Sequence, residues 1–228
     1  MEKTRSVHFL RLNMRIAPMA AGLILALTAC YGEASNDGNS ENPTSARGFC
    51  ENALSAQGKE AVRRVAGIPD SVRMRFSGHS KEGANEIVSS YDSGASGEAE
   101  NLDFCRIYRG SSEVMPSVQV EFSLVQEVEK REEGTIGKDY RMGVLSRANA
   151  KLGVLYFECS SARFKSGAGA TVLVRGESRS NDEVTESGKA APEDNLRIIY
   201  ESSRAFSGLL ECKSNAGLPT DFKMPPEL

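Results

Sequence analysis

Tryptophan is absent from this 228-residue chain, and aromatic residues make up only 7% of it. Sugar-binding surfaces commonly rely on exposed Trp or Tyr rings, so this shortage disfavours a carbohydrate-binding module. Histidine is almost as rare, because His8 and His79 are the only two. A nucleophilic mechanism that pairs Ser or Cys with His would therefore have very few residues to use.

Several catalytic and binding motifs are also missing. The chain contains no G-x-S-x-G, no H-E-x-x-H, no P-loop and no dinucleotide-binding fingerprint. Cysteine pairs of the C-x2-C type, which are typical of zinc sites, do not occur either. The sequence therefore predicts no catalytic residue, no metal site and no cofactor.

The N-terminus carries the pattern of an export signal. A basic segment, 1–15, precedes an apolar run of about a dozen residues, 16–27, and this run is too short to span a membrane. The run ends in the letters LTAC, which resemble the lipobox of bacterial lipoproteins. The resemblance implies that Cys30 receives a diacylglycerol and becomes the N-terminus after cleavage. Two acyl chains give stable anchoring, so we expect a cell-membrane lipoprotein that faces outside the cytoplasm.

Three regions follow from this pattern. Residues 1–29 are the expected signal peptide, and residues 30–48, rich in Gly, Ser, Asn and Glu, are the expected flexible tether. Residues 49–228 are long enough for one folded domain with a real core. After removal of residues 1–29, 24 basic and 30 acidic residues remain, a net charge of about −6. This charge argues against nucleic acid or anionic headgroups as main partners.

Four cysteines remain in the expected domain: Cys50, Cys105, Cys159 and Cys212. An even number of cysteines in an exported domain favours disulfides over a metal site. Of the three possible connectivities, we favour Cys50–Cys105 and Cys159–Cys212, because each then closes one half of the domain.

The hydrophobic pattern predicts an α+β fold. Helices are expected in 54–69 and 191–213, with Ser55 as an N-cap and Pro192 in a first turn. Strands are expected where apolar residues alternate or run together. These segments are 71–79, 102–110, 117–124, 140–146, 152–161 and 171–179. Short connections indicate a mostly antiparallel sheet, with an N-terminal and a C-terminal helix packed on it. Residues 80–101 are predicted as a loop-rich segment with at most a short strand at 86–90.

The domain resembles a group of uncharacterised lipoproteins from actinobacteria. The similar stretches are FCENALSAQGKEAVRRVAG, FCRIY, FECSSAR and NLRIIYESSRAFSGLLECKSNAGLP. The resemblance implies a lipobox, a spacer and a domain with four such cysteines. It implies no activity, substrate or catalytic residue.

Two single residues and two acidic clusters are candidates for a functional role. His79 would act as a base or pH sensor, although a surface turn is the simpler interpretation. Tyr91 is the best candidate for an exposed contact residue in a loop, with packing on its own domain as the alternative. Two acidic clusters resemble solvated loops more than calcium sites, because the EF-hand spacing is absent. Their members are Glu129, Glu132, Glu133, Asp182, Glu183 and Glu186.

Three functions are compatible with these observations. The first is an anchored protein-interaction or binding module without catalytic activity, with a partner in the cell envelope. The second is a lipoprotein that presents a small ligand of unknown identity to a transporter. The third is an unrecognised cell-envelope hydrolase.

Overall fold

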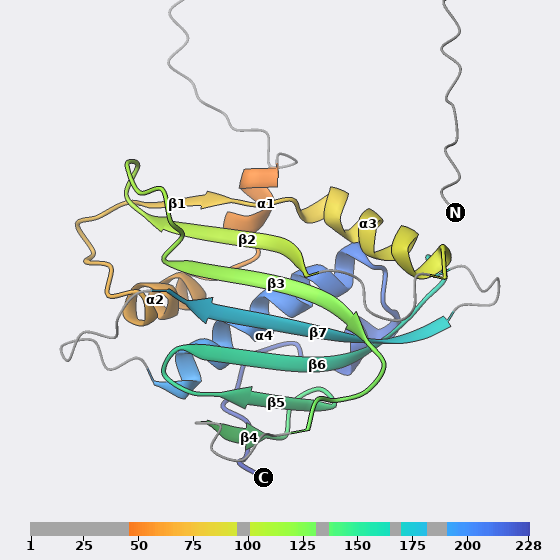
Figure 1. Ribbon diagram of the computed structural model, residues 1–228. Coiled ribbons are helices and arrows are strands. Elements are labelled where there is room, and N and C mark those ends of the chain that lie inside the picture. The colour runs from red at the N-terminus through yellow and green to blue at the C-terminus, as the bar shows by residue number, and fades with distance from the viewer. Residues whose placement is uncertain (1–45, 95–100, 131–136, 165–169, 182–190) are drawn as a thin grey trace, which may run out of the picture. The chain divides into compact units, whose positions relative to one another are not determined.

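The computed structural model describes residues 46–94, 101–130, 137–164, 170–181 and 191–228, so the expected signal peptide, Cys30 and most of the tether lie outside the described residues. The described chain forms four α-helices, seven strands and one short 3-10 helix (Figure 1). The helices are α1 (Ala46–Asn52), α2 (Ala56–Val65), α3 (Ser80–Asp92), α4 (Pro192–Leu209) and η1 (Lys213–Gly217). The strands are β1 (Met74–Ser77), β2 (Leu102–Arg109), β3 (Val118–Val125), β4 (Lys138–Tyr140), β5 (Leu145–Ala148), β6 (Leu152–Ser161) and β7 (Ala170–Ser180).

All seven strands form one antiparallel sheet in the order β1-β2-β3-β7-β6-β5-β4. The chain leaves the centre of the sheet after β3, forms β4 at the far edge, and returns through β5, β6 and β7 to pair with β3. The predicted α+β class, with a mostly antiparallel sheet and helices near both ends of the domain, is confirmed.

The two faces of the sheet differ in chemistry. Along β3, Val118, Val120, Phe122 and Leu124 are buried, and they point toward the helices. The intervening side chains of β3 belong to the opposite face, because successive residues in a strand alternate. This opposite face, here called the outer face, carries mainly charged and polar side chains.

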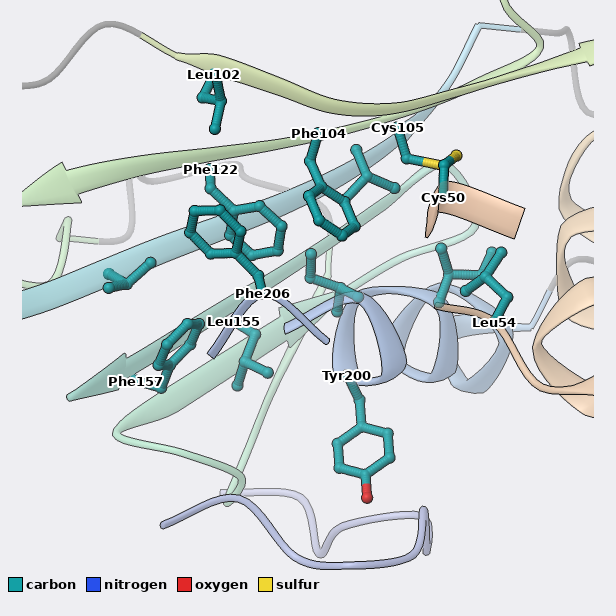
Figure 2. Packing of buried hydrophobic residues seen from close by; sticks show 14 of the residues in the cluster. Cys50, Leu54, Leu102, Phe104, Cys105, Phe122, Leu155, Phe157, Tyr200 and Phe206 are labelled. Atoms are coloured by element: carbon teal, nitrogen blue, oxygen red, sulfur yellow. A yellow bond between two sulfur atoms is a disulfide. The ribbon is translucent and has the colours of Figure 1, made fainter. Parts of the chain in front are cut away.

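Three phenylalanines form the centre of the core (Figure 2). Phe122 of β3 stacks on Phe206 of α4 with ring centroids 4.1 Å apart, and Phe104 of β2 meets both rings edge-on. Gly176 of β7 makes this packing possible, since a Cβ there would lie 2.6 Å from the Phe122 ring. Helix α4 supplies the predicted apolar stripe, because Leu196, Ile199, Ser203, Phe206 and Leu210 are all buried.

Both predicted disulfides are present. Cys50 of α1 is bonded to Cys105 of β2, with Cα atoms 5.4 Å apart, and Figure 2 shows this bond beside the core. Cys159 of β6 is bonded to Cys212, just after α4, with Cα atoms 5.0 Å apart. Each bond therefore fixes a helical segment to the sheet.

Two local predictions about helices have different outcomes. Ser55 is indeed the N-cap of α2, and its hydroxyl accepts a hydrogen bond from the Gly58 amide at 3.1 Å. The prediction of a loop-rich segment over 80–101 is wrong for its first part, which is helix α3. Ala84 and Ile87 of α3 are buried with the helical spacing of three, so contact with the core stabilises this helix.

Candidate functional site

One end of the sheet carries a mainly apolar cleft of about 460 Å³, which we call the sheet-end cleft. It lies where β3 ends and β7 begins, between the last turn of α3 and the turn before β5. Its described lining residues are Ser90, Tyr91, Leu124, Val125, Gln126, Val144, Glu158, Thr171, Val172 and Leu173. Five separate segments of the chain thus meet at one end of the sheet.

Strand register builds the floor of this cleft. Val125 of β3 lies opposite Leu173 of β7, and Leu173 lies opposite Glu158 of β6. These three side chains therefore form one row on the outer face, two of them apolar and one acidic. Val144, in the turn before β5, adds a further aliphatic side chain that is 49% exposed.

Tyr91 forms one wall of the cleft. It lies in the last turn of α3 and not in a loop, and its ring meets the buried Phe164 ring edge-on with centroids 5.2 Å apart. The interpretation that Tyr91 packs on its own domain is confirmed, the expected loop is wrong, and a role as a contact residue stays a prediction. The residue packs on its own domain, and it also presents part of its ring to the cleft.

Glu158 is the only charged side chain among the described residues that line the sheet-end cleft. It is exposed, and it makes no hydrogen bond or ion pair with any described residue. A carboxylate without a protein partner, beside an aliphatic surface, is suited to an apolar group that carries a positive charge.

His79 lies in a neighbouring cleft of about 400 Å³. This second cleft is lined by His79, Glu86, Ile87, Ser90, Asn101, Leu102 and Asp103, so the two clefts share Ser90. His79 directly precedes α3 and makes no side-chain cap hydrogen bond. Its side chain also forms no hydrogen bond with a described Ser, Asp or Glu side chain, so it lacks the partners typical of a nucleophilic site.

The outer face also carries a row of three carboxylates that the sequence did not reveal. Asp103, Glu121 and Glu177 lie opposite one another across β2, β3 and β7. Arg106 binds Asp103, and both Arg175 and Arg179 bind Glu177. These cations offset most of the like-charge repulsion that directly opposed acids produce.

Glu121 is the carboxylate in this row whose negative charge is least neutralised by nearby cations. Its Oε1 accepts a hydrogen bond from Gln119 at 2.7 Å, but no Arg or Lys pairs with it among the described residues. Burial raises the pKa of the Glu121 carboxyl above its ordinary value, and the charges of Asp103 and Glu177 raise it further.

The acidic clusters from the sequence fall mostly outside the described residues. Glu132, Glu133, Asp182, Glu183 and Glu186 are not described. Glu129 is described and is already engaged, because its Oε1 lies 3.5 Å from Arg175 and its carbonyl oxygen accepts a hydrogen bond from Arg147. Within the described ranges, no three His, Cys, Asp or Glu side chains are grouped so that they could hold a metal ion.

The chain was also compared with known proteins. Searches against protein families, curated proteins and solved structures found no match in any of the three comparisons. As far as residues 46–228 are described, none of the helices could serve as a membrane span.

Proposed function

We propose that this protein is a binding lipoprotein without catalytic activity. A lipid on Cys30 holds it in the cell membrane, its folded domain faces outside the cytoplasm, and the sheet-end cleft receives its ligand. The cleft is the observation that carries the binding role. The basic segment 1–15, the short apolar run 16–27 and the lipobox-like letters LTAC support the anchor.

The lining of the cleft favours a compact apolar ligand with a positive charge. Tyr91, Val125 and Leu173 offer a hydrophobic surface, and burial of apolar area supplies most of the binding free energy in such sites. Glu158 selects among apolar ligands, because its carboxylate attracts a cation and repels an anion.

Cleft size favours a small molecule over a broad protein interface. Small-molecule sites enclose about 300–1,000 Å³, and the sheet-end cleft, at about 460 Å³, falls within that range. The geometry thus supports the small-ligand role more strongly than a protein-interaction role. The hydrolase alternative receives less support, since His79 lies in the other cleft without a catalytic partner.

Two small probes test the binding role. Hexyltrimethylammonium combines an apolar tail with a cation, and hexyl sulfate has the same tail with an anion. The chain from position 31 onward, free of lipid and detergent, is titrated with each probe by calorimetry. We expect the ammonium ion to bind more tightly than the sulfate. A result with no binding of either probe, or with equal binding of both, would contradict the proposed ligand class.

Glu158→Gln and a matched exposed control locate the site. Removal of the Glu158 charge should weaken binding of the ammonium probe roughly two- to fivefold, the range expected for an exposed ion pair. Glu211→Gln, which removes an exposed carboxylate outside the cleft, should leave the affinity unchanged. If both substitutions weaken binding equally, the effect comes from overall charge and not from the cleft.

The anchor is tested separately. Cells that express the full chain are labelled with a palmitate analogue and fractionated, with Cys30→Ala as the control. We expect label on the unaltered protein in the membrane fraction and no label on Cys30→Ala. An unlabelled, unaltered protein would overturn the lipid anchor without affecting the cleft measurements.

A further inference from the structure

We propose that the turn between β2 and β3 touches the lipid surface when the protein is anchored, so that the domain is held at the membrane in a fixed orientation. This inference rests on the lipid anchor of the proposed function. The contact residues are Val114 and Met115, which we call the apolar tip. The ligand is a bilayer surface with anionic headgroups.

The apolar tip is unusually exposed for its composition. Val114 is 88% exposed and Met115 is 71% exposed, the highest values among the large hydrophobic residues that the structure describes. Single exposed apolar side chains are common on protein surfaces, but these two are adjacent in sequence and lie together on one turn. No described residue of the domain covers them.

Hydrogen bonds hold the turn that carries the apolar tip in place. The Glu113 carboxylate accepts hydrogen bonds from the Arg109 amide at 2.8 Å and from the Ser117 hydroxyl at 3.2 Å. On the other side of the tip, the Asn181 side chain donates to the Pro116 carbonyl oxygen at 3.0 Å. Both flanks are therefore fixed by hydrogen bonds, and the two apolar side chains between them project outward.

Arginines lie beside the tip, and the Glu113 carboxylate of the same turn is engaged in hydrogen bonds to Arg109 and Ser117. Arg73 and Arg109 are exposed, and the Gly110 amide donates to the Arg73 carbonyl oxygen, so both arginines lie at the base of the turn. Arg75 donates to the Glu113 carbonyl oxygen at 2.9 Å and stacks on the Tyr108 ring. Exposed apolar residues beside Arg are the combination that partitions to an anionic membrane surface.

The net charge of about −6 predicted that anionic headgroups would not be main partners, and the local arrangement refines that expectation. Electrostatic attraction to a surface acts only within a Debye length, about 8–10 Å at physiological salt. The charges at the base of the turn therefore matter more for this contact than charges elsewhere on the domain.

The segment between Cys30 and α1 is long enough for the apolar tip to reach the membrane that holds the lipid. Cys50 of α1 is bonded to Cys105, and β2 runs from Cys105 to the turn over about 17 Å. Figure 1 shows α1 on the β1 side of the sheet and the β2–β3 turn at the left ends of β2 and β3, while β4 forms the opposite edge. The 15 residues between Cys30 and Ala46 extend to at most about 55 Å, which is enough for the tip to reach the bilayer.

The absence of tryptophan gives a direct test. Met115→Trp places a single fluorescent reporter at the tip, and Met224→Trp places the same reporter in the C-terminal segment, which pairs with β4 at the opposite edge. Each lipidated full chain is reconstituted into vesicles of phosphatidylcholine with phosphatidylglycerol, and flotation confirms that the protein is anchored.

We expect the tryptophan at position 115 to emit at shorter wavelength in vesicles and to be quenched by brominated lipid, while the tryptophan at position 224 shows neither effect. Val114→Asp in the Met115→Trp background should abolish the shift, and circular dichroism checks that this variant folds. The shift should be smaller in vesicles of phosphatidylcholine alone.

Other outcomes separate the two proposals. Protein that floats with vesicles while the tryptophan at position 115 stays in water overturns the tip contact and leaves the anchor intact. Protein that does not float overturns the anchor itself. A reporter at 115 that is shielded in whole cells but exposed in vesicles points to a protein partner, and this result also overturns the membrane contact.

Discussion

Arg64 and Asp194 join helix α2 to the first turn of helix α4. Arg64 Nη2 lies 2.6 Å from Asp194 Oδ1, and Arg64 Nε lies 3.1 Å from the same oxygen. The other carboxylate oxygen, Oδ2, accepts a hydrogen bond from the Ala191 amide at 3.3 Å. A single carboxylate, only 7% exposed, thus links two helices and satisfies a free amide at the start of α4.

Asp194→Ala should lower the free energy of unfolding by about 2 kcal/mol, because it removes a charge-assisted pair and a helix cap together. Urea unfolding at pH 7 measures this change. Lys138→Ala is the matched control, since it breaks an ion pair to Glu227 in which both side chains are more than half exposed. No measurable loss is expected for the control, and an equal loss in both variants would contradict the assigned role.

Loss of either disulfide should be costly. The Cys50–Cys105 and Cys159–Cys212 bonds connect residues 55 and 53 positions apart, so the chain-entropy model assigns each about 4 kcal/mol. Paired Cys→Ser variants, one for each bond, are compared with the unaltered protein by thermal unfolding in the absence of reductant. A melting temperature that does not change in a paired variant would show that the corresponding bond does not constrain the unfolded chain.

Gly208→Ala should raise the free energy of unfolding by about 0.5–1 kcal/mol. Gly208 is exposed in the last turns of α4, a Cβ there would meet no other atom within 4 Å, and Ala loses less backbone entropy than Gly on helix formation. Denaturant unfolding measures the gain.

Gly143→Ala is the opposite case and serves as the control. Gly143 has φ +63°, and a Cβ there would collide with the Tyr156 carbonyl oxygen, so this substitution should cost at least about 1 kcal/mol. If Gly208→Ala also destabilises the protein, the helix does not extend through this position in solution.

Local pattern was enough to predict much of the fold. The alternation of β3, the apolar run of β6 and the stripe of α4 are periodic signals that each segment carries by itself. The disulfide pairing was favoured because each bond then closes one half of the domain, and the structure confirms it. The strands and the helix stripe depend on residues that are near one another in the chain, and the disulfide pairing depends on the order of the four cysteines along it.

Helix α3 and the sheet-end cleft could not be predicted in the same way. The sequence of α3 includes Gly83 and paired serines, which are weak helix formers, and burial of Ala84 and Ile87 against the core decides the outcome. The cleft combines Tyr91, Glu158 and Leu173 from three distant segments. Their proximity follows from the order and register of the strands in the sheet. The spacing of apolar and polar residues within one segment does not predict that order or register.

The raised pKa of Glu121 predicts a pH-dependent effect of Glu121→Gln. The folded state binds the Glu121 proton more tightly than the unfolded state, so this carboxyl makes the protein less stable as pH rises from about 4.5 through its folded pKa. Above that range the full penalty of a charged carboxylate between Asp103 and Glu177 is present. Glu121→Gln keeps the shape of the side chain and removes the charge, so the variant should be more stable than the unaltered protein at pH 7.

The difference in the free energy of unfolding between Glu121→Gln and the unaltered protein should shrink as the pH falls toward 4, because the Glu121 carboxyl then takes up its proton and loses its charge. Urea unfolding at both pH values measures it. Ser123→Ala is the control, because Ser123 lies two residues along the same face of β3 and carries no ionisable group; its effect should be the same at both pH values. A Glu121→Gln variant that is less stable at pH 7 would show that the hydrogen bond from Gln119 outweighs the burial and repulsion of the carboxylate.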